Sequence, residues 1–221
     1  MIIIGHQGAK GHYRGNTLRS IKIAKTLKTN IIELDVRLLD EEKIFVLYHD
    51  DKIKLFDETE KNIEECFWNE LNMLGVCTLN KALGEFESNP EFVLYLDIKI
   101  NKEKDNEYLI DFGKRLINIF KDLNLLVLVC SFNKKFINLF STLEGNTNFN
   151  LGYIFEKDEE FQNNDNVDIF IFHDETNYDQ NLMNELKKQE KISFVYTVND
   201  ENRKKQIKNE KLFDGYVTDF P

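Results

Sequence analysis

Positive charge, cysteine, proline and long apolar runs are all scarce in this 221-residue sequence. Its 39 acidic residues outnumber the 29 Lys and Arg, and the net charge of −10 argues against a nucleic-acid-binding protein, which needs a basic face to neutralise phosphates. No apolar run approaches the roughly 20 residues that span a bilayer, so we predict no stable membrane insertion. The first residues lack the apolar core of a signal peptide, so a cytoplasmic location is expected.

The few cysteines and prolines also limit the architecture. The cysteines Cys66, Cys77 and Cys130 are odd in number and show no CxxC spacing, which argues against a disulfide framework or a zinc cluster. Two prolines and the lack of a Gly/Ser-rich stretch leave no visible linker. We therefore predict a single domain over residues 1–221, and no feature of the sequence indicates an oligomeric state.

Short apolar runs typical of buried strands alternate with amphipathic stretches typical of helices. The predicted strands are Ile2–Ile4, Ile31–Val36, Phe92–Ile98, Leu125–Cys130, Phe149–Ile154, Val167–Phe172, Ile192–Thr197 and Phe213–Val217. The predicted helices include Thr17–Leu27, Asn106–Leu123, Lys134–Leu143, Gln180–Gln189 and Glu201–Asn209. Eight strands with intervening helices in this length predict an α/β fold of the (β/α)₈ TIM-barrel type. The alternative, an open doubly wound sheet, lacks its glycine-rich phosphate loop here.

One additional apolar run breaks the alternation. Ile44–His49 follows Ile31–Val36 too closely for a helical crossover, so the two runs should form an antiparallel hairpin. If the hairpin turns near Asp40–Glu42, His49 returns beside Glu33. The polar stretch Asp51–Gly75 that follows is expected to be a short inserted subdomain after this hairpin.

Titratable side chains recur where the predicted strands end, and the C-terminal ends of barrel strands are where such folds place their chemistry. Glu33 and Asp35 stand two apart in one strand and therefore point the same way. Asp97 and Lys99 share a face on another strand, and His6 ends the first. Three convergent carboxylates repel one another unless a cation lies between them, and hard oxygen ligands suit Mg²⁺ or Ca²⁺.

Such a site could cleave a phosphodiester. A metal ion and Lys99 would neutralise the phosphate oxygens, while one imidazole of His6 and His49 removes a proton and the other protonates the leaving alkoxide. Each residue also has an ordinary structural explanation. A strand-end histidine is commonly solvated, an ExD pair is commonly an exposed face, and Asn16-Thr17 is a typical helix cap. The shared position at one end of a barrel favours the functional interpretation.

The order of motifs resembles the glycerophosphodiester phosphodiesterase family over nearly the whole chain. The matching motifs are HQG at His6–Gly8, RGNT at Arg14–Thr17, ELDV at Glu33–Val36, YHDD at Tyr48–Asp51, LDIK at Leu96–Lys99, SF at Ser131-Phe132, YTVN at Tyr196–Asn199 and DGYVTDFP at Asp214–Pro221. The resemblance implies metal-dependent hydrolysis of a small-molecule glycerophosphodiester to sn-glycerol 3-phosphate and an alcohol. It implies His6 and His49 as the acid/base pair, Glu33, Asp35 and Asp97 as ligands of one divalent ion, and Lys99 as a phosphate contact.

Three positions depart from the family pattern. Gln7 replaces the Arg of HRG, Gly15 replaces the Glu of PENT, and Asp97 replaces a Glu. The first two changes together remove a charged pair as a unit. Arg37 lies two residues after Asp35 and should point to the same side of the strand as Glu33 and Asp35. We hypothesise that Arg37 or Lys10 partly supplies the missing positive charge.

These departures predict a slower enzyme or a different substrate. They also leave open a catalytically degenerate phosphodiester-binding barrel, and a cyclising lyase of the same superfamily remains a further alternative. The head group would lie near the inserted stretch, with Phe56, Phe155 or Tyr178 as candidate wall residues.

Overall fold

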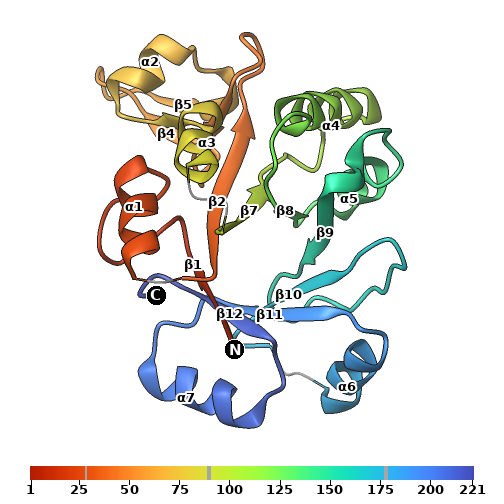
Figure 1. Cartoon of the computed structure of the whole chain (residues 1–221). Coiled ribbons are helices and arrows are strands. Elements are labelled where there is room, and N and C mark those ends of the chain that lie inside the picture. The colour runs from red at the N-terminus through yellow and green to blue at the C-terminus, as the bar shows by residue number, and fades with distance from the viewer. Residues whose placement is uncertain (28, 89–90, 177–178) are drawn as a thin grey trace.

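The computed structural model describes residues 1–27, 29–88, 91–176 and 179–221. Eight parallel strands form a closed ring in which each strand pairs with the next and β1 pairs with both β2 and β12 (Figure 1). In ring order they are β1 (Ile2–Gly5), β2 (Ile31–Leu38), β7 (Val93–Ile98), β8 (Val127–Ser131), β9 (Phe149–Ile154), β10 (Ile169–His173), β11 (Ile192–Tyr196) and β12 (Gly215–Thr218). The predicted TIM barrel is confirmed.

Helices surround this ring on its outside. They are α1 (Leu18–Thr26), α3 (Leu79–Glu87), α4 (Asn106–Phe120), α5 (Lys134–Phe140), α6 (Gln180–Lys188) and α7 (Glu201–Glu210). Each begins after a Thr, Asp or Asn whose side chain accepts a backbone N–H of the first turn. The link between β9 and β10, residues 155–168, is described throughout and contains no helix, so one βα unit of the ring is incomplete.

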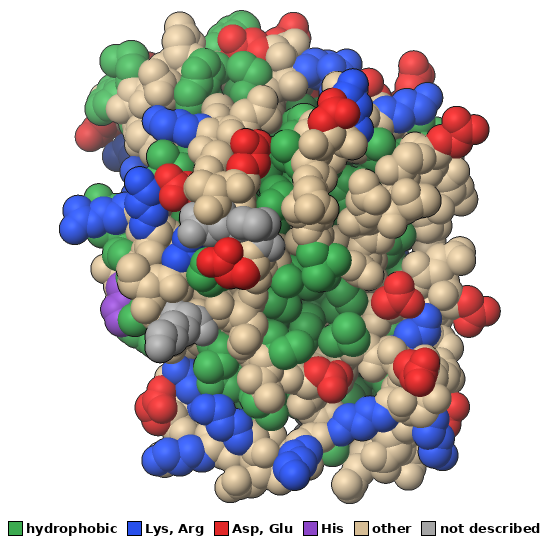
Figure 2. Space-filling model, in the orientation of Figure 1, with side chains coloured by type: hydrophobic (Ala, Val, Ile, Leu, Met, Phe, Trp, Pro, Cys, Tyr) green, Lys and Arg blue, Asp and Glu red, His purple; other side chains and the backbone are tan. Residues whose placement is uncertain are grey.

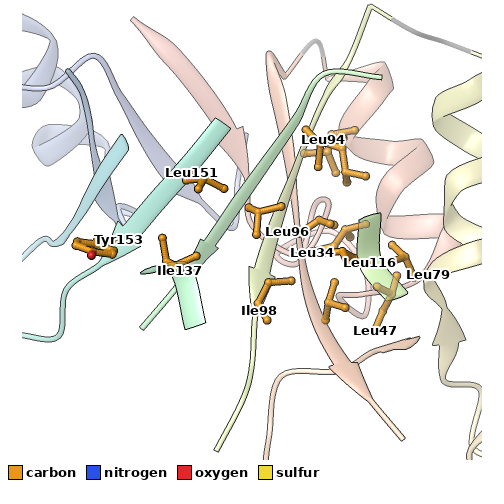
Figure 3. Packing of buried hydrophobic residues seen from close by; sticks show 14 of the residues in the cluster. Leu34, Leu47, Leu79, Leu94, Leu96, Ile98, Leu116, Ile137, Leu151 and Tyr153 are labelled. Atoms are coloured by element: carbon orange, nitrogen blue, oxygen red, sulfur yellow. The ribbon is translucent and has the colours of Figure 1, made fainter. Parts of the chain in front are cut away.

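Alternation along the strands divides their side chains between two cores. Outward residues such as Leu34 and Leu96 pack with helix residues such as Leu116 and Ile137 in one large cluster (Figure 3). Inward residues such as Ile31, Tyr95 and Cys130 fill the barrel interior. Because β2 is buried along its whole length, its inward polar residues are enclosed by the barrel.

The predicted hairpin and inserted segment are both present. Strand β3 (Phe45–Leu47) pairs antiparallel with β2, with Val36 opposite Leu47. The segment after it contains β4 (Lys52–Lys54), β5 (Glu60–Asn62), the 3₁₀ turn η1 (Ile63–Glu65), α2 (Trp68–Met73) and β6 (Cys77–Thr78). A separate core lies beneath it: Leu39, Val46, Ile53, Ile63, Cys66, Leu71 and Val76.

This inserted subdomain carries several of the exposed large apolar side chains, including Phe56, Phe67 and Met73. Figure 2 shows apolar side chains over it at the top left and in a second patch near the middle of the face, with Lys, Arg, Asp and Glu interspersed around them. None of the described helices is both long and apolar enough to traverse a bilayer.

Candidate active site

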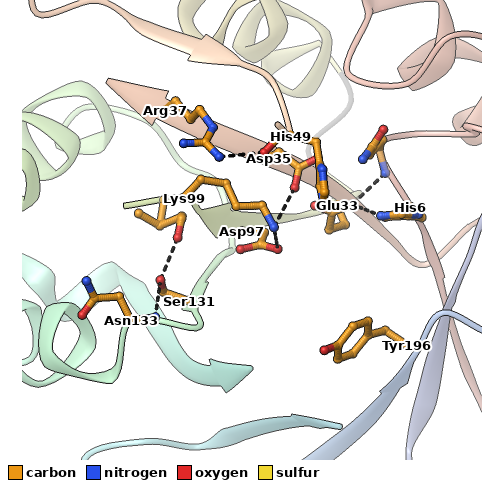
Figure 4. A network of polar contacts seen from close by, with 12 residues as sticks. His6, Glu33, Asp35, Arg37, His49, Asp97, Lys99, Ser131, Asn133 and Tyr196 are labelled. Atoms are coloured by element: carbon orange, nitrogen blue, oxygen red, sulfur yellow. Dashed lines mark hydrogen bonds and ion pairs between the residues drawn. The ribbon is translucent and has the colours of Figure 1, made fainter. Parts of the chain in front are cut away.

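An acidic cluster lies inside the barrel, where β2 and β7 run side by side. Asp35 is in register with Asp97, and Glu33 is two residues earlier on the same inward face (Figure 4). One oxygen from each carboxylate lies within 4.8 Å of the other two, and all three residues are buried. The structure thus brings together the three predicted metal ligands.

The three carboxylates ionise unequally. Burial, reinforced by the charges of Asp35 and Asp97, raises the pKa of Glu33 well above its usual value. Burial also raises the pKa of Asp97. Burial opposes ionisation of Asp35 as well, but Lys99, His49 and a hydrogen bond from Asn16 outweigh it and lower the pKa of that carboxyl.

Lys99 is the cation that the protein itself supplies. Its Nζ lies 2.7 Å from Asp97 Oδ2 and 3.2 Å from Asp35 Oδ1. Burial disfavours the charged ammonium, but the two aspartates prevail and raise its pKa. Lys99 therefore stays charged at the edge of the cluster, where the sequence predicts a phosphate contact.

The single ammonium group of Lys99 does not provide hydrogen bonds to all the carboxylate oxygens of the cluster. Glu33 Oε1, Asp35 Oδ1 and Asp97 Oδ1 are buried and accept no hydrogen bond; Lys99 approaches Asp35 Oδ1 without hydrogen-bond alignment. Buried oxygens of this kind are costly unless a partner fills the space between them. An all-oxygen set of three carboxylates is suited to a hard divalent cation, so the residues present fit the predicted metal.

His6 follows β1 and is fixed by a residue after β12. Its Nδ1 lies 2.6 Å from Asp219 Oδ1, and its Nε2 lies 4.0 Å from Glu33 Oε2. Asn199 Nδ2 donates to the other Asp219 oxygen at 2.7 Å. A carboxylate bound to one ring nitrogen fixes the orientation of the other, as in general-base catalysis. We did not predict these roles for Asp219 and Asn199, although both lie in the YTVN and DGYVTDFP motifs.

His49 approaches the same cavity from the segment after β3. Tyr48 N–H donates to the Asp35 carbonyl, which places His49 beside the acidic residues in the middle of β2. Its Nδ1 lies 2.7 Å from Asp50 Oδ1, and its side chain is half exposed. His6, His49, Glu33, Asp97 and Lys99 line one cavity of about 150 Å³, with the rings of Phe132 and Tyr196 among its walls. Both predicted catalytic histidines therefore border the acidic cluster.

Asn16 is a third residue whose role the sequence did not reveal. Thr17 is the expected cap of α1, but Asn16 is buried and exchanges two hydrogen bonds with Asp35. Asn16 Nδ2 donates to Asp35 Oδ2 at 2.8 Å, and Asp35 N–H donates to Asn16 Oδ1 at 3.1 Å. Asn16 has a φ of 57°, a left-handed conformation that asparagine tolerates better than most residues. It holds one carboxylate of the cluster in place.

The hypothesis that Arg37 contacts the phosphate is not supported. Arg37 lies on the predicted face of β2, but its guanidinium donates to the His49 carbonyl at 2.8 Å, to Asp51 at 2.6 Å and to Glu64 at 3.3 Å. Because these three partners belong to the inserted subdomain and the segment that leads into it, Arg37 anchors that part of the chain. The other candidate, Lys10, is exposed and lines a neighbouring cavity.

The two motif departures lie in contact with each other. Gln7 is buried with a φ of 50°, and its side chain covers Gly15: a Cβ at position 15 would lie 2.3 Å from Gln7 Oε1 and 2.7 Å from Gln7 Cβ. A glutamine at 7 and a side chain at 15 would therefore compete for one space. Gly15 is therefore the residue that leaves room for the Gln7 side chain.

The suggested head-group residues do not form a common wall. Phe155 is buried and stacks on Phe172 with ring centroids 5.2 Å apart, so it belongs to the outer core. Phe56 is exposed on the inserted subdomain. Tyr178 lies outside the described residues.

Comparison with known proteins agrees with this fold. The chain is similar in structure to a phosphodiesterase from Oleispira antarctica in complex with the product sn-glycerol-3-phosphate (19% identity, TM-score 0.82, covering 100% of this chain and 94% of that one). It is also similar to a glycerophosphodiester phosphodiesterase from Thermotoga maritima (22% identity, TM-score 0.78, covering 99% and 94%) and to another from Parabacteroides distasonis (21% identity, TM-score 0.81, covering 99% and 92%). No curated protein shows a significant sequence match. Residues 6–221 match the model of the glycerophosphoryl diester phosphodiesterase family, and the chain belongs to that family.

Proposed function

We propose that the protein hydrolyses glycerophosphodiesters to sn-glycerol 3-phosphate and an alcohol, with one divalent cation, Mg²⁺ or Ca²⁺, held by Glu33, Asp35 and Asp97. The observation that carries the proposal is the set of buried carboxylate oxygens that accept no hydrogen bond, beside two histidines in one cavity. Family membership and the sn-glycerol-3-phosphate bound to the Oleispira antarctica structure support this substrate class.

The chain's own residues divide the chemistry between charge and proton transfer. A bound cation would supply Lewis acidity toward the phosphate oxygens. Lys99 adds a fixed positive charge beside the cluster. His6, oriented by Asp219, and His49 border the cavity from different elements, so one ring can take the proton of the attacking group while the other protonates the leaving alkoxide. The rings of Phe132 and Tyr196 form an aromatic part of the cavity wall.

The test measures release of sn-glycerol 3-phosphate from glycerophosphocholine and glycerophosphoethanolamine. EDTA should abolish release, and Mg²⁺ or Ca²⁺ should restore it. His6→Ala and His49→Ala should each lower kcat by about 10²- to 10⁴-fold. His12→Ala is the matched control, because His12 is exposed and contacts Phe220 instead of lining the cavity.

Each contrary result has a defined meaning. Full activity in EDTA would reject the metal, and full activity of either histidine variant would reject the acid/base assignment. Tight phosphodiester binding without turnover would identify a degenerate barrel. Accumulation of a cyclic phosphodiester, observed by ³¹P NMR, would identify a lyase.

A further inference from the structure

A second cavity of about 380 Å³ adjoins the catalytic one, and the two share His49. Its walls come from residues 7–17 between β1 and α1, from residues 47–50 at the end of β3, and from residues 75–76 of the inserted subdomain. A substrate whose phosphate occupies the catalytic cavity at His49 can extend past that ring into this second cavity. The chemistry described above makes no use of it.

The charge of this cavity is opposite to that of the protein as a whole. Lys10 and Arg14 line it, and the only acidic residue of its described wall, Asp50, is already bound to His49. Within residues 1–27, 29–88, 91–176 and 179–221, no carboxylate forms an ion pair with Lys10 or Arg14. In a chain with net charge −10, two cations that form no ion pair with a described residue line the same space, although the charge of Lys10 contributes to lowering the pKa of Asp219.

The structure holds Arg14 at this wall. Its Nη1 donates to the Leu74 carbonyl at 3.0 Å, and its own carbonyl accepts from Thr17 Oγ1 at 2.8 Å. The single side-chain bond to Leu74 leaves other guanidinium N–H groups for a ligand, and this fork of donors matches the oxygens of a phosphate or carboxylate.

The remainder of the wall near these cations is uncharged. The Gln7 amide covers Gly15, which has no side chain of its own, so this part of the cavity adds neither a positive nor a negative group. The charge of the ligand is therefore selected by Lys10 and Arg14.

We infer that this second cavity binds an anionic group carried by the alcohol part of the substrate. The preferred substrates are then glycerophosphodiesters whose alcohol bears a further phosphate or carboxylate. The inference rests on the proposed function, since the scissile phosphate must occupy the catalytic cavity. A neutral alcohol would leave both cations unpaired, whereas a second anion would accept charge-assisted hydrogen bonds from them.

The test compares glycerophosphoinositol with its 4-phosphate, which differ by one phosphate on the alcohol. The wild-type protein should favour the 4-phosphate by about tenfold in kcat/KM, the scale expected of two partly exposed charge contacts. Lys10→Gln/Arg14→Gln should reduce this preference to about one. Lys102→Gln/Lys157→Gln, which removes two exposed lysines after β7 and β9, should keep it.

Equilibrium binding of the same two compounds to His6→Ala by calorimetry separates this inference from the proposed function. Preferential binding of the 4-phosphate that is lost on adding Lys10→Gln and Arg14→Gln supports the anion site, even if neither compound is hydrolysed and the proposed function fails. Equal affinities for the two compounds would overturn the inference, and so would a preference that survives loss of both cations.

Discussion

A Glu33→Gln substitution is expected to stabilise the metal-free protein while weakening its affinity for a divalent cation. The folded state binds the Glu33 proton more tightly than the unfolded chain does, because burial and two neighbouring aspartates raise its pKa. Stability of the metal-free protein therefore falls as the pH rises above the ordinary value of 4.5. Glutamine removes that charge and keeps an acceptor for the Gln7 N–H.

The gain at pH 7 should be about 1–3 kcal/mol, the scale for relieving a partly compensated buried charge. For a chain of this length that corresponds to a rise of roughly 3–10 °C in Tm. The gain should shrink as the pH is lowered toward 4.5, because Glu33 of the wild type then becomes protonated. Scanning calorimetry in EDTA measures this effect. Excess Mg²⁺ or Ca²⁺ should raise the Tm of the wild type and leave the variant nearly unchanged.

Asp35→Asn provides the matched control, since it removes a carboxylate from the same strand and the same cluster. Lys99, His49 and Asn16 lower the pKa of Asp35, so its charge stabilises the folded state at pH 7. Its replacement should lower the Tm. The reasoning is refuted if Glu33→Gln lowers the Tm in EDTA, or if the two variants shift it in the same direction.

Three further predictions concern the residues around the cluster. Asp219→Asn should lower kcat about 10²-fold or more with little change in KM, because His6 loses the carboxylate that orients it. A large fall in Tm that accompanies the loss of kcat would indicate a merely structural role. Arg37→Ala should cost about 2–3 kcal/mol in urea unfolding, because it releases Glu64 and the His49 carbonyl; a rise in KM alone would restore the phosphate-binding hypothesis. Gly15→Ala should cost about 1–3 kcal/mol, and Gln7→Ala in the same chain should recover most of it; a purely additive double-mutant cycle would contradict the contact.

Strand order and the acidic cluster could be predicted because they follow from local pattern and parity. Glu33 and Asp35 alternate with apolar residues that pack outward, so the sequence alone predicts that both carboxylates point inward. The alternation of side chains along a strand did not predict the partners of Arg37. Arg37 lies on the same face as Glu33 and Asp35, but it binds Asp51 and Glu64 of an inserted segment whose path the sequence did not define. The cytoplasmic location stays a prediction.

The missed residues depend on contacts between distant segments. Asn16 reaches Asp35 only because the loop after β1 folds back over β2, and a helix-capping position gives no sign of that bond. Asp219 reaches His6 across a sequence separation of 213 residues. Similarly, the fit of Gln7 over Gly15 needs the loop's backbone conformation, which composition does not encode.

The bond between His6 and Asp219 also sets when the proposed catalytic site can assemble during protein synthesis. β1 leaves the ribosome early, yet its histidine has no orienting carboxylate, and its strand no β12 to pair with, until translation has passed Asp219. A nascent chain interrupted before that point carries both histidines and all three acidic residues, but the candidate site is not assembled. Premature termination therefore yields a fragment that lacks the oriented His6 on which the proposed hydrolysis depends.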